Sequence, residues 1–341
     1  MNALPESISI EEFITKLENL DDHFFNAAVI KDFLKSDSIE KENVFRVFAW
    51  LISFDLIPVS KDKALRSLTH LYLDFQKFVN ENFDNINDPL SSLNEDDANL
   101  IALDIKRISE WFLKIASPLT FDQCYFSDLH LHLYRILASI SKTSRKYNYT
   151  QGFDRYVTMT YILSLDFIRN FDLPLDFAEM LSYHFSLKFI DLSRKYISLT
   201  DMELTMSRFD VFDQRIIERM PEKMELLKQC GSKSFHFGLR WAILLFSDEH
   251  EFYECILLWD HFILHQNDFN SFLQNVFISH LKQIPINEET NFIDTIQRFR
   301  KWNISEIIAE AEAETTTDKP SLVLAACTAF ALAVVFSHGF R

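Results

Sequence analysis

Residues 94–118 read NEDDANLIALDIKRISEWFLKIASP, and this stretch indicates the fold class. Asn94 is a good helix N-cap, and three carboxylates follow it in the first turn, where negative charge complements the helix dipole. Pro118 marks the end of the pattern. The stretch predicts one amphipathic helix, with Arg107 beside the apolar stripe, where it can flank a groove. The stripe recurs every three or four positions, at Ile101, Ile105, Ile108, Phe112 and Ile115.

The same helical spacing recurs along most of the chain. It predicts further helices over residues 9–36, 39–56, 60–84, 127–142, 153–170, 175–200, 207–219, 221–230, 236–247, 250–265, 268–283 and 288–300. Glycine occurs only 4 times and proline 8 times among 341 residues, too few for the tight turns of a β architecture. We therefore predict an all-α fold, with a polar loop around Pro89.

The composition is that of a globular protein with an acidic surface. The chain is 48% hydrophobic and 25% charged, and its length allows a large core in one domain or two. The net charge of −16 argues against nucleic acid as the main partner, because phosphate backbones bind basic surfaces, but it leaves room for one local basic site. None of the four cysteines has the spacing of a metal or redox motif, which favours buried free thiols in a reducing compartment.

The C-terminal segment is apolar and uncharged. Leu322 to Phe336 contains no charge, and Ser321 and Ser337 extend the run to about 17 residues, the lower limit for a helix that spans a bilayer. We predict a transmembrane tail anchor over residues 321–338, an acidic tether over 301–320, and a main domain on the cytosolic side. A buried C-terminal helix is the alternative. So short a span suits a thin membrane, such as that of the endoplasmic reticulum.

A second short motif, Tyr149-Thr150-Gln151-Gly152, follows a polar segment and precedes an apolar helix. Glycine is so rare here that Gly152 suggests a positive φ or a close backbone approach. Taken alone, Gln151 fits an ordinary helix start, and Tyr149 fits a packed ring with a tethered hydroxyl. Arg107 alone likewise fits a helix pair with Asp104, worth about 0.2–0.5 kcal/mol.

Together and in this order, the two motifs resemble the arginine-finger and glutamine-finger motifs of TBC-domain GTPase-activating proteins, which act on Rab GTPases. Ile101-x-x-Asp104-x-x-Arg107 is similar to the first, and Tyr149-x-Gln151-Gly152 is similar to the second. Two further segments resemble other motifs of the family. They run from Phe45 through Arg46 and Trp50 to Ile52, and from Arg240 through Trp241 and Glu249 to the Leu258-Trp259-Asp260 helix.

The resemblance implies an all-α, V-shaped fold of two lobes over residues 39–300, preceded by a helical extension over 1–38. It also implies that a GTP-bound Rab lies in the cleft, and that no cofactor is needed. Arg107 would neutralise charge at the γ-phosphate, and Gln151 would orient the attacking water. A permanent planar cation and a side chain that both donates and accepts suit these two tasks.

The resemblance extends to further residues and to the membrane. We expect supporting roles for Asp104, Tyr149 and Gly152, and partner-binding roles for Arg155, Trp241 and Asp260. Arg155 adds a second cation near the proposed cleft, and Trp241 taken alone fits a core residue. The apolar tail is similar to that of the membrane-anchored subgroup, which acts on Rabs of the early secretory pathway. We therefore expect a protein of the endoplasmic reticulum or Golgi that acts in vesicle traffic.

Some positions depart from the family pattern or admit another reading. Ile108 stands where Thr or Ser is usual, and residues 153–155 also differ, which leaves substrate preference open.

A non-catalytic Rab-binding adaptor and a helical scaffold without a GTPase partner are the alternatives. Asp128, His130 and His132 do not predict a metal site, because on a helix His130 points away from the other two and no zinc motif is present.

Overall fold

The computed structural model describes residues 10–39, 41–126, 128–143, 149–286 and 291–318, and every regular element there is helical. The prediction of an all-α fold is confirmed. Four short 3₁₀ helices accompany the α-helices. The α-helices are α1 (Ile10–Glu18), α2 (Ala27–Lys35), α3 (Asn43–Ser53), α4 (Lys61–Asn82), α5 (Glu95–Ala116), α6 (Leu129–Thr143), α7 (Phe153–Phe171), α8 (Leu175–Tyr196), α9 (Met202–Arg219), α10 (Pro221–Gln229), α11 (Phe235–Leu244), α12 (Phe252–Leu264), α13 (Phe269–Gln283), α14 (Phe292–Arg298) and α15 (Ile304–Asp318).

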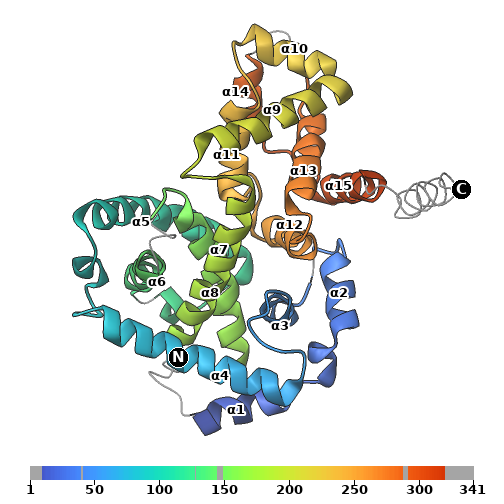
Figure 1. The fold of residues 1–341 in the computed structure, drawn as a ribbon. Helices are drawn as coiled ribbons and strands as arrows, with labels where there is room; N and C mark the ends of the chain where they lie inside the picture. Colours follow the sequence, from blue (N-terminus) through green and yellow to red (C-terminus); the bar gives the residue numbers. More distant parts are fainter. Residues whose placement is uncertain (1–9, 40, 127, 144–148, 287–290, 319–341) are drawn as a thin grey trace, which may run out of the picture.

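The helices form two lobes (Figure 1). The larger lobe holds α1 to α8, and the smaller holds α9 to α11, α13 and α14, with α12 at the junction. Helix α7 is the central element, because it packs against α8, α3, α6, α5 and α11. Most of its residues are buried, including the polar side chains of Asp154, Thr160 and Asp166. A helix that is buried all round is fixed by its neighbours, so its first turn is a firm base for a functional site.

The helix boundaries follow local signals in the sequence. The predicted segment 9–36 divides into α1 and α2, because Asp21 and Asn26 each cap a new helix through their side chains. Asn94 caps α5 by accepting from the Asp97 backbone N–H at 2.9 Å, as the sequence predicted. Asp201 caps α9 in the same way and starts that helix earlier than the predicted residue 207.

A buried carboxylate joins the two lobes. Asp260 on α12 has no exposed surface. It accepts hydrogen bonds from Lys41 Nζ at 2.9 Å, from Arg46 Nε at 3.2 Å and from Trp50 Nε1 at 2.7 Å. Arg46 and Trp50 lie on α3, and Lys41 lies just before it. The first family-like segment therefore bonds directly to the last one, across most of the chain.

Two residues that were predicted to bind a partner are core residues instead. Asp260 is engaged by the three donors just described. Trp241 on α11 is 1% exposed and packs against Phe237, Phe246 and Phe277. Because neither side chain reaches the surface, the partner-binding interpretation of both is wrong, and their role is to hold helices together.

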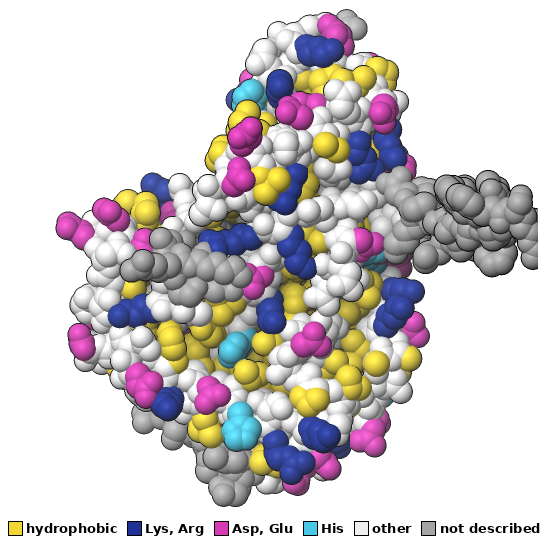
Figure 2. All heavy atoms as spheres, in the orientation of Figure 1, with side chains coloured by type: hydrophobic (Ala, Val, Ile, Leu, Met, Phe, Trp, Pro, Cys, Tyr) yellow, Lys and Arg dark blue, Asp and Glu magenta, His cyan; other side chains and the backbone are white. Residues whose placement is uncertain are grey.

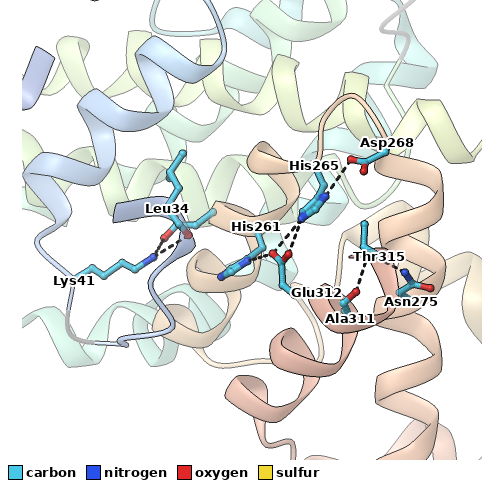
Figure 3. A network of polar contacts seen from close by, with 10 residues as sticks. Leu34, Lys41, His261, His265, Asp268, Asn275, Ala311, Glu312 and Thr315 are labelled. Atoms are coloured by element: carbon cyan, nitrogen blue, oxygen red, sulfur yellow. Dashed lines mark hydrogen bonds and ion pairs between the residues drawn. The ribbon is translucent and has the colours of Figure 1, made fainter. Parts of the chain in front are cut away.

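Residues 301–320 were predicted to be a tether, but residues 304–318 of this segment form a packed helix, α15. Helix α15 lies against α13 and α12, and its Ile307 and Ala311 are fully buried. Figure 3 shows the polar contacts that hold it: Glu312 accepts from His261 Nδ1 at 2.7 Å and from His265 Nε2 at 3.1 Å. Thr315 is also buried and accepts from Asn275 at 2.9 Å.

The predicted transmembrane segment, residues 321–338, lies outside the described residues. Within the described ranges, none of the helices combines the length and the apolar character that crossing a bilayer requires.

The Asp260 cluster predicts a large cost for removing its charge. Asp260→Asn keeps the shape but leaves Lys41 and Arg46 buried without a counter-charge, which costs about 3–5 kcal/mol. Chemical denaturation will show the loss as a lower free energy of unfolding. Asp74→Asn, on the exposed face of α4, is the control and should change stability by less than about 0.5 kcal/mol. Equal stability of the two variants would contradict the assignment.

The docking of α15 predicts a stability contribution that depends on pH. Burial alone would raise the pKa of Glu312, but the hydrogen bonds and charges of His261 and His265 outweigh it and lower the pKa from 4.5 to about 2. This contribution is present above pH 4.5 and is lost as the pH falls through the lowered pKa. Burial would lower the pKa of His265, but Glu312 and Asp268 raise it above 6.5, so its contribution is lost as the pH rises through that raised pKa.

We therefore expect Glu312→Gln to destabilise the protein most between pH 4.5 and 6.5, by about 1–3 kcal/mol for hydrogen bonds to a charged group. The difference from wild type should shrink on both sides of this window. Thermal unfolding at pH 3, 6 and 9 measures it, with Glu306→Gln on the exposed face of α15 as the control. A difference that is constant across pH would rule out the imidazole contacts as its source.

Candidate functional site

A cavity of about 580 Å³ opens where α5, α7 and α11 meet. Figure 2 shows Lys and Arg side chains gathered near the junction of the two lobes, although the protein as a whole is acidic. The cavity has a polar wall from α5 and α7 and a more apolar wall from α11. Its lining residues are Asp104, Arg107, Ile108, Gln151, Gly152, Asp154, Arg155, Phe235, His236, Leu239, Arg240, Ile243, Leu244 and Asp248.

Helix α5 presents Arg107 at this cavity. The Arg107 side chain is 65% exposed, and its Nη1 lies 3.6 Å from Asp104 Oδ1. That separation is an ion pair but is too long for a hydrogen bond, so Asp104 attracts the guanidinium without fixing it. Ile108, the next residue, is 1% exposed and belongs to the buried stripe of α5. The guanidinium of Arg107 is therefore largely exposed and held only by a loose ion pair with Asp104.

Asp104 also joins α5 to the second motif. Its other oxygen, Oδ2, accepts a hydrogen bond from the Tyr149 hydroxyl at 2.7 Å. Burial, followed by the nearby charges of Asp154 and Asp104, raises the pKa of Tyr149 well above its usual value, so the phenol stays protonated and remains a donor. The Tyr149 ring packs edge-on against Phe153. One carboxylate thus attracts Arg107 and anchors the segment that carries Gln151.

The turn before α7 requires glycine. Gly152 has φ of +108°, and a Cβ placed there would lie 2.6 Å from Leu244 Cδ2 on α11. Both reasons inferred from the sequence, a positive φ and a close approach, are present. The Gly152 N–H donates to Asp154 Oδ1 at 3.1 Å. Gln151, just before this turn, is exposed and lines the same cavity as Arg107.

Asp154 is a buried carboxylate at the start of α7. Burial raises its pKa, the Arg155 charge lowers it, and the charges of Asp104 and Asp248 raise it further, giving a pKa of about 6. Its bond to the Gly152 N–H satisfies one of the backbone donors that a helix start leaves unpaired. Asp154 thus supports the turn that carries Gln151, a role that the sequence reading did not assign to it.

Arg155, predicted to bind a partner, lines the cavity but is already engaged. Its Nε lies 2.9 Å from Asp248 Oδ1, and its guanidinium carbon lies 4.1 Å from the centre of the Trp111 ring. The sequence reading did not single out Trp111 or Asp248. Trp111 could have been noticed, because it follows Arg107 by one helical turn and so shares its face of α5.

The remaining motif residues form the far wall and its support. Arg240 lines the cavity from α11 and bonds to Glu249, which is 4% exposed. Arg300 bonds to the other oxygen of Glu249 at 3.1 Å. Glu249 therefore connects α11 to the segment that follows α14. His132, weighed as a metal ligand, instead lies against Glu179 together with Arg135.

Comparison with known proteins agrees with this architecture. A search among curated proteins gave no match. The crystal structure of the Ypt/Rab-GAP domain of Gyp1p superposes with a TM-score of 0.68 at 14% sequence identity, covering 91% of this chain and 100% of that domain. The crystal structure of a Chlamydomonas flagellar RabGAP TBC domain aligns with a TM-score of 0.49 at 13% identity, covering 89% and 88%.

The likeness to the Gyp1p domain shows a shared fold. The profile of the Rab-GTPase-TBC domain family matches residues 43–285, which span α3 to the end of α13 and include every residue that lines the cavity. The chain therefore belongs to the Rab-GTPase-TBC domain family.

Proposed function

We propose that this protein is a GTPase-activating protein for a Rab-family GTPase and that it supplies Arg107 and Gln151 to the GTP-bound partner. The observation that carries the proposal is their shared exposure: two side chains from separate segments line one cavity, and neither is buried. Membership of the Rab-GTPase-TBC domain family supports the same activity.

The chemistry follows from the two side chains. Hydrolysis of GTP spreads negative charge over the γ-phosphate oxygens, and a guanidinium delivered in trans stabilises that charge. Such an arginine contributes about 10³–10⁵ in rate. The Gln151 carboxamide can accept a hydrogen bond from water while it donates one to a backbone group, so it can hold the nucleophile in line. The chain itself binds no nucleotide in this scheme, because it completes the active site of its partner.

Asp104 and Tyr149 support the two fingers by contacts within the protein. Asp104 lies beside Arg107 and biases its direction, and the Tyr149 hydroxyl ties the Gln151 segment to the same carboxylate. A long ion pair leaves Arg107 able to move toward a phosphate, which attracts a guanidinium more strongly than a single carboxylate does. The free protein therefore holds Arg107 near its working position at little energetic cost.

The C-terminal segment adds a location to the proposal. We infer from the sequence that residues 321–338 anchor the protein in the membrane of the endoplasmic reticulum or Golgi, where it would act on a Rab in vesicle traffic. The uncharged run from Leu322 to Phe336 is the observation behind this inference.

Substitution of either finger should abolish most of the activation. We expect Arg107→Ala to lower the single-turnover rate of GTP hydrolysis about 10³-fold or more, and Gln151→Ala about 10²-fold. The measurement uses a panel of GTP-loaded Rabs with saturating activator. Lys106→Ala, also exposed on α5 but outside the described cavity lining, is the control and should keep the wild-type rate.

Other outcomes decide between the alternatives. Equal acceleration by the wild type and both variants would defeat the finger assignment. Tight binding of Rab without acceleration would favour an adaptor, and failure of every GTP-loaded Rab to bind would favour a scaffold.

The membrane inference has its own test. The full chain should remain in the pellet of carbonate-washed membranes, because an apolar span resists extraction at high pH, whereas a chain ending at residue 320 should be released. Extraction of both chains alike would refute the anchor and leave the proposed activity untouched.

A further inference from the structure

Arg155 connects three parts of the chain that meet around the cavity: α5, α7 and the turn after α11. It lies in the first turn of α7, its guanidinium stacks on Trp111 of α5, and its Nε bonds to Asp248 in the turn between α11 and α12. Only 25% of its side chain is exposed. A residue with this many partners is poorly placed to serve chiefly as a contact for a visiting protein.

Its contacts reach the segments that carry both fingers. The Arg155 N–H donates to the Gly152 carbonyl at 3.0 Å, next to Gln151. Trp111 follows Arg107 by four positions, so the two side chains lie on the same face of α5, one turn apart. The Arg155 side chain thus spans from the backbone that carries one finger to the helix face that carries the other.

Arginine suits this position for a physical reason. Its planar guanidinium can lie flat on an indole ring while an edge N–H reaches a carboxylate, and it keeps its charge at every physiological pH. Lysine could pair with Asp248 but could not stack in the same way. Asp104 and Tyr149 give the two segments one connection, and Arg155 gives them a second connection that also reaches the α11 wall.

We propose that Arg155 is a positioning residue, which sets the spacing of Arg107 and Gln151 by joining α5, α7 and the turn after α11 through Trp111 and Asp248. The proposal rests on the proposed GTPase activation, because it concerns the geometry of those two fingers. It departs from the partner-binding role expected from the sequence: Arg155 acts through other residues and not on the Rab.

A positioning role changes the rate more than the affinity, because small displacements of a catalytic group are costly in the transition state. With the Rab that the wild type accelerates most in the panel, Arg155→Ala should lower kcat about tenfold and change KM less than twofold. Trp111→Leu should do the same, although Trp111 is not among the described residues that line the cavity. The kcat measured with Arg155→Lys should lie between the values for Arg155→Ala and the wild type.

Double variants test whether these residues act as one unit. Trp111→Leu should cost less than a further twofold in the Arg155→Ala background. Arg155→Ala should likewise cost less than a further twofold once Arg107→Ala has removed the group that it positions. Independent effects that multiply, or a rise in KM with kcat unchanged, would overturn the proposal and return Arg155 to direct contact with the partner.

One readout requires no activity. The indole N–H resonance of Trp111, assigned by its loss in Trp111→Phe, should shift in Arg155→Ala and in Asp248→Asn but not in Lys106→Ala. An unmoved resonance would overturn the inference even if the wild type is a strong activator. A wild type that accelerates no Rab would instead overturn the proposed function, while a shifted resonance would still show that Arg155 and Asp248 act on α5.

Discussion

The fold depends on one buried negative charge. Asp260 lies where α12 meets α3, and it is surrounded by the ammonium of Lys41, the guanidinium of Arg46 and the indole of Trp50. Removing these charges from water is expensive, and the cost is offset only because the donors converge on both carboxylate oxygens. Burial lowers the pKa of Lys41, although Asp260 opposes the shift. The cluster leaves little freedom in how the two lobes meet.

The two walls of the cavity come from different lobes, so their separation depends on that junction. Its polar wall belongs to α5 and α7 in the larger lobe, and its apolar wall belongs to α11 in the smaller lobe. Within the polar wall, Asp104 attracts Arg107 with one oxygen and accepts the Tyr149 hydroxyl with the other. The charged groups of the proposed site are therefore held in place by contacts within the protein itself.

Local features of this chain could be predicted from the sequence, and distant pairings could not. The apolar spacing and the caps located nearly every helix, and the need for glycine at residue 152 followed from its rarity. Asp260 was misplaced on the surface because its three donors lie more than 200 positions earlier, which no single sequence reveals. The packing of α15 was missed because Ala and Glu alternate over residues 309–314, so that beyond the buried Ile307 and Ile308 its inner face carries small side chains and little apolar contrast.

The contact between Gly152 and Leu244 divides the cavity into a fixed part and a variable part. A side chain at Gly152 would be strained by the φ of +108°, and its Cβ, 2.6 Å from that methyl group, would force Leu244 to move. Phe235, His236 and Leu239 on the opposite wall lie at the surface or only partly below it, and their backbone is ordinary helix. Substitutions on this wall would therefore change the surface that a partner meets, while the backbone beside Gln151 keeps its conformation.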